Sequence, residues 1–309
     1  MKTISCVAFL GLTFAAAVAV SAASAPTPAA GKISGHAYFD ADRYVEYVAG
    51  DLPVVISSPH GGRLKPDALP NRTGGVTEMD VNSQELARAV ADAFLARTGH
   101  HVHLVASHLH RGKLDPNREI AEAAQGNPLA ERAWRDYHAA IAEALAAAVA
   151  RHGFAFLVDL HGHAHPIARL ELGYALEAKQ LNRPDADLDT AGLIEVSTLR
   201  DLHRRVGGSA AALLRGPRSL GALFAALGFP ATPSPTAPQP GGGPFFAGGY
   251  TVRQHAGGET PKVDGLQIEC HRVGVRDTAE HRARFAQTAA EVLTRFIEEH
   301  YPFKFPAKN

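Results

Sequence analysis

The sequence predicts an α/β protein, a three-layer αβα sandwich around a mixed central sheet. Helix-like and strand-like patterns alternate along the chain, which is the order expected when helices cover both faces of a sheet. The run from Phe154 to Leu160 is almost wholly apolar, as is typical of a central strand covered on both faces. With 309 residues, of which 46% are hydrophobic, residues 46–309 are expected to form a single domain.

Each predicted element rests on its local pattern. Short apolar runs predict buried strands, and apolar residues at helical spacing predict helices. The predicted strands cover 53–58, 103–106, 154–160 and 266–269, and the predicted helices cover 81–98, 128–151 and 278–300. Gly153 is expected to end the long Ala-rich helix. The segment Pro230–Pro244 contains six prolines, so a loop over the site is expected there rather than a linker between domains.

The N-terminus has the features of an export signal. Met1 and Lys2 give a positive start, Val7–Val20 is apolar, and small residues follow, so residues 1–25 are interpreted as a signal peptide cleaved near Ala22 to Ala25. An uncleaved anchor is the alternative, although the apolar run is short for a membrane span. Residues 26–45 are expected to be flexible. The prediction is a periplasmic or secreted protein with no stable membrane anchor after cleavage.

Charge and cysteine content narrow the class further. Lys+Arg and Asp+Glu both number 31, and a chain without net charge is a poor partner for nucleic acid or an anionic membrane. After cleavage only Cys270 of the two cysteines remains, so no internal disulfide is expected and folding must rest on the core and any metal.

Two histidines follow predicted strands and are candidate metal ligands. His60 comes just after a buried strand and is followed by two glycines, and His161 stands at the end of the strongest predicted strand. Imidazole nitrogens in such positions suit zinc. Asp159 points the same way along the strand as His161 and could orient it. His163 and His165 are alternatives to His161.

Catalytic zinc usually has three protein ligands and an open position, and a carboxylate is the natural third ligand. The stretch Thr77-Glu78-Met79-Asp80 is expected to open the helix that follows the His60 loop, and both Glu78 and Asp80 could reach back toward that loop. The alternative is ordinary helix-start chemistry, with Thr77 as the N-cap and acids in the first turn.

Glu269 is the candidate general base. A carboxylate in an apolar strand is costly to bury unless it is paired or useful, and beside a metal-activated water it could accept a proton and pass it to a leaving amine. The alternative is a buried salt bridge with Arg253 or Arg272.

The segment from Arg111 to Arg118 contains the candidate groups that bind and polarise the substrate. One guanidinium can hold a substrate carboxylate and another can stabilise an oxyanion. Asp115 could fix the turn of this string while Asn117 and Arg118 face one ligand.

Taken together, these motifs resemble the N-formylglutamate amidohydrolase family, one of the zinc carboxypeptidase-like amidohydrolases. The resemblance runs from about Pro53 to Arg272. It is carried by the Ser-Pro-His-Gly stretch at 58–61, Asp80, the string 111–118, Asp-Leu-His at 159–161, Gly-Gly-Tyr at 248–250 with Arg253, and Gln-Ile-Glu at 267–269.

The resemblance implies a phosphorylase/hydrolase-like, zinc carboxypeptidase-like fold and one Zn²⁺ per chain. The implied ligands are His60, His161 and one carboxylate, which is Asp80 by the family pattern, or Glu78 by similarity to zinc-dependent N-acetylmuramoyl-alanine amidases. Glu269 would be the base, and Arg111 would polarise the carbonyl. Asn117 and Arg118 would hold the substrate's α-carboxylate, and Tyr250 and Arg253 would line the pocket.

The expected function is an exported zinc-dependent amidohydrolase that cleaves the amide bond of a small N-acyl amino acid, N-formyl included, by attack of metal-activated water. A short peptide is the alternative substrate. Because family members that serve histidine catabolism are expected in the cytoplasm, the export signal puts the formylglutamate substrate in question. One alternative is a zinc peptidase or N-acetylmuramoyl-alanine amidase-like enzyme acting on cell-wall peptides. Another is a non-catalytic exported protein that binds carboxylates.

Overall fold

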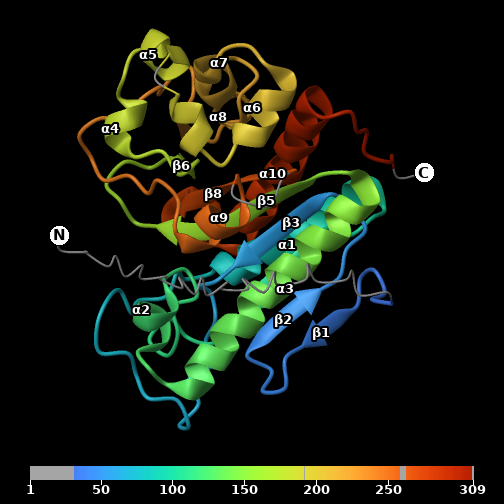
Figure 1. Ribbon diagram of the computed structural model, residues 1–309, viewed down its shortest axis with the longest axis vertical. Coiled ribbons are helices and arrows are strands. Elements are labelled where there is room, and N and C mark those ends of the chain that lie inside the picture. The colour runs from blue at the N-terminus through green and yellow to red at the C-terminus, as the bar shows by residue number, and fades with distance from the viewer. Residues whose placement is uncertain (1–30, 191, 258–261, 308–309) are drawn as a thin grey trace, which may run out of the picture.

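The computed structural model describes residues 31–190, 192–257 and 262–307. The expected signal peptide lies outside these residues. The described chain forms an α/β fold built on an eight-stranded mixed sheet with strand order β1-β2-β4-β3-β5-β8-β6-β7 (Figure 1). The strands are β1 (Ala37–Phe39), β2 (Val45–Val48), β3 (Val54–Ser58), β4 (His103–Ser107), β5 (Ala155–His163), β6 (Leu170–Gly173), β7 (Ala231–Thr232) and β8 (Val263–His271).

The centre of the sheet is parallel and its edges are partly antiparallel. Strands β4, β3, β5 and β8 run parallel to one another. On one side β2 pairs antiparallel with β4, and on the other β6 pairs antiparallel with β8. The carboxyl ends of the four central strands therefore meet at one edge of the sheet, which is where ligands bind in open α/β sheets.

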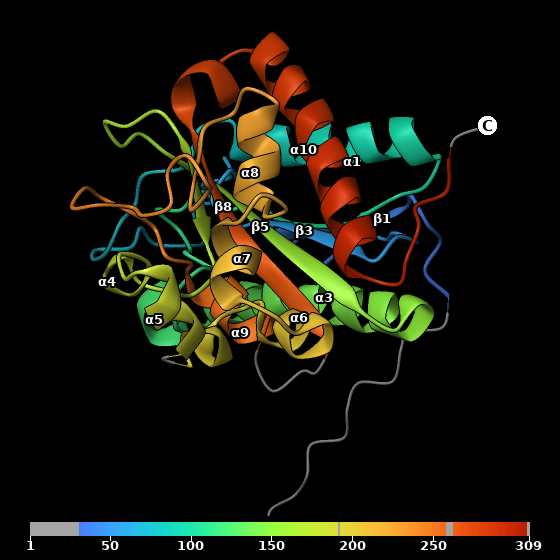
Figure 2. The same cartoon turned by 90° about the horizontal axis from the view of Figure 1, so that it is seen from above.

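Helices cover both faces of this sheet (Figures 1 and 2). On one face lie α1 (Ser83–Thr98) and α10 (Ala279–His300), which pack against each other. On the other lie α3 (Pro128–His152) and α9 (Tyr250–His255). Two apolar cores result, one on each face of the sheet. The predicted three-layer αβα arrangement with a mixed sheet is confirmed.

Short helices fill the connections. They are α2 (Ile120–Ala124), α4 (Ala178–Leu181), α5 (Asp185–Thr190), α6 (Arg200–Val206), α7 (Ala210–Arg215) and α8 (Leu220–Ala226), with a 3₁₀ turn at Leu193–Val196 and a π-type turn at Arg272–Arg276. Among the described residues, no helix combines the length and apolar character needed to cross a membrane.

The N-terminal part of the described chain is more ordered than expected. In the segment 26–45, predicted to be flexible, Ala37–Phe39 forms β1 and pairs antiparallel with β2. The physical reason lies in β2, where Val45 and Tyr47 are buried in the core under α3. The sheet therefore begins before residue 46.

Candidate active site

A cavity of about 500 Å³ opens at the carboxyl ends of the central strands. Its wall carries eight of the residues singled out from the sequence as metal ligands, general base, or electrophilic and substrate-binding groups. The residues concerned are His60, Glu78, Asp80, Arg111, Asn117, Arg118, His161 and Glu269. A cavity of this size suits a small-molecule substrate.

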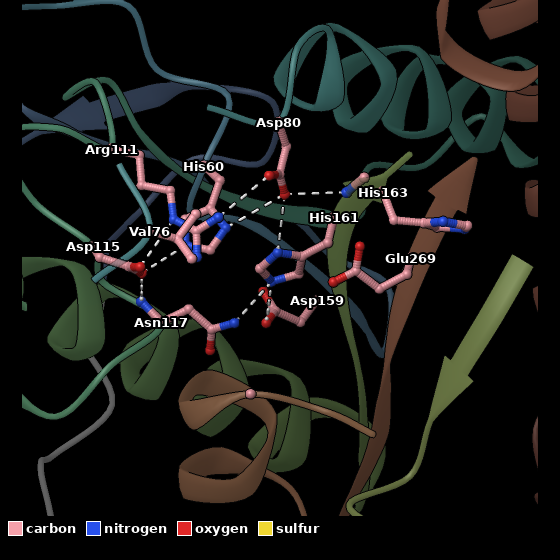
Figure 3. Close-up of polar contacts among 12 residues, drawn as sticks. His60, Val76, Asp80, Arg111, Asp115, Asn117, Asp159, His161, His163 and Glu269 are labelled. Carbon is pink, nitrogen blue, oxygen red and sulfur yellow. Dashed lines mark hydrogen bonds and ion pairs between the residues drawn. The ribbon is translucent and has the colours of Figure 1, made fainter. Parts of the chain in front are cut away.

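Three of these residues form a compact group of ligand atoms. Nδ1 of His60 lies 3.4 Å, and Nδ1 of His161 3.2 Å, from the same oxygen, Oδ2 of Asp80. Figure 3 shows the three side chains converging. The backbone helps to bring them together, because Asp80 N donates a hydrogen bond to His60 O at 3.1 Å.

A buried carboxylate stands behind each imidazole. Asp115 Oδ1 lies 2.6 Å from Nε2 of His60, and Asp159 Oδ2 lies 2.9 Å from Nε2 of His161. Ser57 Oγ donates to the other oxygen of Asp159 at 2.7 Å. Carboxylates in this position fix the ring orientation of metal-binding histidines, and here they leave both Nδ1 atoms facing Asp80.

The electrostatics of this group fit a cation. Nδ1 of His60 is buried without a hydrogen-bond partner. Burial alone would raise the pKa of Asp80, yet His60 and His161 hold that pKa well below its usual range. For His161, burial opposes protonation, but Asp159 and Asp80 raise its pKa well above the usual value. Two imidazoles and a carboxylate with these properties form a group that could hold a metal ion.

The two candidates for the third ligand differ in position. Glu78 is exposed on the cavity wall and lies outside the group of ligand atoms. Asp80 is buried within that group. The capping alternative does not hold, because α1 begins at Ser83 with Asn82 as its N-cap, well beyond Thr77.

The alternatives to His161 lie elsewhere on the wall. His163 Nε2 lies 2.8 Å from the carbonyl oxygen of Arg169, and His165 Nδ1 lies 3.0 Å from Glu171. Neither ring contacts Asp80. The structure thus places His161, and not its neighbours, beside His60 and Asp80.

Glu269 lies next to His161, since the two are register partners of β8 and β5. Its Oε1 accepts from Gln267 Nε2 at 2.9 Å, and its Oε2 is buried without a partner. Burial raises the pKa of Glu269 to about 8, Asp80 and Glu171 reinforce the rise, and His161 opposes it. A carboxyl group with a pKa near neutrality suits proton transfer.

The salt-bridge alternative for Glu269 finds no support within the described chain. Arg253 is exposed and bonds to Gly248 O, Ala175 O and Glu177. Arg272 is exposed and forms no ion pair among the described residues.

The string 111–118 reaches the site, but its parts have different roles. Arg111 Nε donates to Asp115 at 2.9 Å, and its Nη1 lies 3.6 Å from Asp80. Asn117 is buried, with Oδ1 accepting from Thr251 N at 2.8 Å and Nδ2 lying 3.2 Å from Nε2 of His161. Arg118 is half-buried and pairs with Glu122 at 3.3 Å.

Two predicted pocket residues do not reach the cavity wall. Tyr250 packs against Trp134 and His138 instead. Arg253 braces the loop at 248, as described above. The wall on that side consists of residues 246–249, which begin two residues after the end of the proline-rich segment.

Three residues make contacts at the site that were not predicted from the sequence. Asp115 was expected to fix a turn, and it also holds His60. Gln267 bonds to Glu269 and accepts from Gly249 N at 2.7 Å. The signal for Gln267 was its two-residue spacing from Glu269 on one strand, which places both side chains on the same face. Glu171 is the third, and its only signal was an acid inside the apolar strand β6.

Comparison with known proteins bears on the fold and the family of the chain. A solved structure of the gene product Atu2144 from Agrobacterium tumefaciens matches with a TM-score of 0.53 at 14% identity, covering 83% of this chain and 94% of that one. This match supports the fold. A structure named N-formylglutamate amidohydrolase from Ralstonia eutropha has a TM-score of 0.48 at 18% identity, covering 83% and 97%. No curated protein matches the sequence.

The family model described as N-formylglutamate amidohydrolase matches residues 120–276, just over half of the chain. The chain therefore belongs to the N-formylglutamate amidohydrolase family.

Proposed function

We propose that this protein is a zinc-dependent amidohydrolase that cleaves the amide bond of a small N-acyl amino acid. The observation that carries the proposal is the placement of Glu269, a buried carboxyl group with a raised pKa, beside the His60, Asp80 and His161 group in one cavity. Family membership supports a hydrolase of this general kind.

The metal would be held by His60, Asp80 and His161. Zinc at such a site polarises a carbonyl oxygen and makes water a better nucleophile near neutral pH. Asp115 and Asp159 keep the two imidazoles in the orientation that exposes Nδ1. Glu78 is not needed as a ligand in this proposal.

Glu269 moves the proton in the reaction. Its carboxylate takes a proton from the attacking water and returns it to the nitrogen of the leaving amine. Oε2 is the atom available for this step, because Gln267 occupies Oε1.

Arg111 steadies the oxyanion. Its Nε and Nη1 face Asp115 and Asp80, which leaves Nη2 without a partner among the described residues and free for a carbonyl oxygen. Because Asp115 fixes the guanidinium before the substrate arrives, the donor needs little rearrangement in the transition state.

Arg118 binds the α-carboxylate of the substrate. Its pair with Glu122 is solvent-exposed on the Glu122 side, and such pairs contribute little stability. Arg118 can therefore exchange Glu122 for a substrate carboxylate. Asn117 supports this end of the cavity by joining Thr251 N to the string.

We also propose that the protein is exported, on the signal-like residues 1–25. Mass measurement of the protein recovered from the periplasm or medium checks this directly. A mature N-terminus near residues 23–26 is expected, and an intact Met1 would contradict it.

The experiment that tests the proposed function is the zinc content of the purified mature protein beside that of His161→Ala. One zinc per chain is expected in the wild type, with loss in the variant. His271→Ala is the matched control, because His271 ends the neighbouring strand β8 and lies outside the ligand group. Failure of the wild type to retain zinc after reconstitution would overturn the proposal.

A further inference from the structure

One wall of the cavity is a pair of aromatic rings fixed by a single buried carboxylate. The ring of His165 stacks on that of Phe246 with centroids 4.6 Å apart and an interplanar angle of 27°. Glu171 is fully buried. Its Oε1 lies 3.0 Å from Nδ1 of His165, and its Oε2 accepts from Phe246 N at 2.9 Å. Glu171 therefore holds both the ring of His165 and the backbone of Phe246.

This wall is not a second metal centre, although His163, His165 and Glu171 lie close enough together for one. Nε2 of His163 is directed at Arg169 O, and its Nδ1 accepts from His165 N at 3.1 Å. Both oxygens of Glu171 are also bonded. Among the described residues, no buried ligand atom of this group lacks a hydrogen-bond partner, in contrast to Nδ1 of His60. The hydrogen bonds instead make the two-ring wall rigid.

The charges of the cavity leave room for one substrate carboxylate. Of its three arginines, Arg111 is paired with Asp115 and Asp80, and Arg276 donates to the carbonyl oxygens of Cys270, Val81 and His163. Only Arg118 has a partner that it can readily exchange. A second carboxylate would also meet the carboxylates of Glu78 and Asp80, which line the same cavity, and like charges at close range repel.

Part of the remaining surface is apolar. Phe246 is 43% exposed and Val76 is 47% exposed, and both line the cavity. An aromatic ring held rigidly at a cavity wall favours a planar apolar partner, which stacks at little cost in conformational entropy.

We propose that Phe246 and His165 form a subsite for a planar apolar group of the substrate. The preferred N-acyl amino acid then carries one carboxylate and an aromatic group, rather than two carboxylates. The aromatic group belongs either to the amino-acid side chain or to the acyl chain, and both offer the same stacking face. This inference rests on the proposed function for the position of the scissile amide.

The test measures binding rather than turnover. N-Formyl-N-hydroxy amino acids are analogues of N-formyl amino acids in which the N-hydroxy amide can chelate zinc. The zinc-loaded protein is titrated calorimetrically with the glycine, phenylalanine and glutamate compounds, and with N-phenylacetyl-N-hydroxyglycine. We expect either the phenylalanine or the phenylacetyl compound to bind at least tenfold more tightly than the glycine compound, and the glutamate compound to show no such gain.

Three variants assign the gain to the wall. Phe246→Ala should abolish the tenfold ratio, and His165→Gln should reduce it. Phe39→Ala should leave it unchanged, since Phe39 stacks on His108 at 6.2 Å in a similar pair outside the cavity.

The outcomes separate the two proposals. A glutamate compound that binds more tightly than both aromatic compounds, or an aromatic gain that persists in Phe246→Ala, would overturn the subsite. Binding of the glycine compound that does not depend on zinc would instead count against the proposed function, and the aromatic-to-glycine ratio would still report on the wall.

Discussion

Glu269 lies where a carboxyl group is expensive to place unless it is used. It is 4% exposed, has one oxygen without a partner, and has a pKa raised to about 8 by burial. Replacing it with Gln keeps the shape and removes the base. We expect turnover of a cleavable N-acyl amino acid to fall by a factor of about 10² to 10⁴ or more, with the zinc content unchanged.

The measurement is kcat and zinc content for Glu269→Gln beside Glu280→Gln. Glu280 lies in the first turn of α10, outside the cavity, so its variant should behave like the wild type. Turnover within a factor of a few of the wild type in Glu269→Gln would contradict the role of Glu269 as the base.

Asp115 supports the metal group without joining it. It is fully buried and bonds to His60 Nε2, Arg111 Nε and Asn117 N. In Asp115→Asn one carboxylate oxygen is replaced by an amide NH2 group, which donates hydrogen bonds and cannot accept from these donors. Because such carboxylates orient the ligand histidine, zinc affinity should fall roughly 10- to 100-fold. Competition with a chelator of known affinity measures this.

The exposed Asp67 gives the control variant Asp67→Asn, whose zinc affinity should equal that of the wild type. Equal affinity in Asp115→Asn as well would show that the contact with His60 does not matter for the metal.

Residues close in sequence could be related by pattern, and residues far apart could not. The orienting contact of Asp159 with His161 was predicted because the two stand two residues apart on one strand. The contact of Asp115 with His60 spans 55 residues and depends on how the loop after β4 folds over the end of β3. No local pattern encodes that geometry.

At the scale of elements, α3 connects the fold to the site. Its Trp134 Nε1 donates to Arg118 O, and His138 Nε2 lies 2.9 Å from Pro116 O. One face of the helix thereby fixes the string 111–118. The sequence predicted this helix closely because its ends carry strong local signals, with Pro128 in the first turn and Gly153 in the left-handed conformation after the last.

The N-cap of α3 offers a direct test of how much the end of this helix contributes to the stability of the fold. Asn127 Oδ1 accepts from Leu129 N and Ala130 N. Asn127→Ala removes this cap and should lower the free energy of unfolding by about 1 kcal/mol, measured by denaturant titration. Asn127→Asp is the matched variant and should restore most of the loss. If Asn127→Asp lost as much unfolding free energy as Asn127→Ala, the cap would not be the source of the effect.

The elements between 164 and 229 were not predicted in the same way. Helices α4 to α8 are each at most seven residues long, which is too short for a clear period. They are held by tertiary contacts such as those of Arg215, which bonds to Asp185, Leu181 O and Pro238 O. The sequence shows which side chains can make such contacts, but it does not show which distant residues they contact.

At the scale of the whole molecule, the parallel sheet assembles the site from distant segments. His60, His161 and Glu269 follow or end β3, β5 and β8, which are neighbours in the sheet. The sequence could predict this meeting point because strand ends share one edge in a parallel sheet. It could not predict which side chains face the cavity, as Tyr250 and Arg253 show, because their orientation depends on how the loop before α9 packs.

A buried histidine pair ties the stability of the whole fold to pH. His138 Nδ1 lies 2.9 Å from His255 Nε2 between α3 and α9. With Nε2 of His138 donating to Pro116 O, its Nδ1 must accept from His255, so the ring of His138 is neutral. Burial lowers the pKa of His138 to about 4 and that of His255 to about 3. A proton on Nδ1 of His138 would oppose the donor of His255.

The direction of the pH dependence follows from these pKa values. Above the ordinary histidine pKa of 6.5 both rings are neutral in the folded and the unfolded chain, so the pair causes no loss of unfolding free energy. As pH falls below 6.5 the unfolded chain binds protons that the folded chain does not, so stability declines until the folded pKa near 4 is reached. For His138 the loss has an upper value of roughly 3 kcal/mol.

The variant His138→Gln isolates this contribution, because the amide can donate to Pro116 O and accept from His255 without titrating. Its unfolding free energy, measured in metal-free protein from pH 8 to 4, should fall less steeply than that of the wild type. The exposed His36 gives the control His36→Gln, which should follow the wild type. Parallel curves for wild type and His138→Gln would mean that the pair does not stay neutral in the folded protein, and that α3 and α9 tolerate a charge between them.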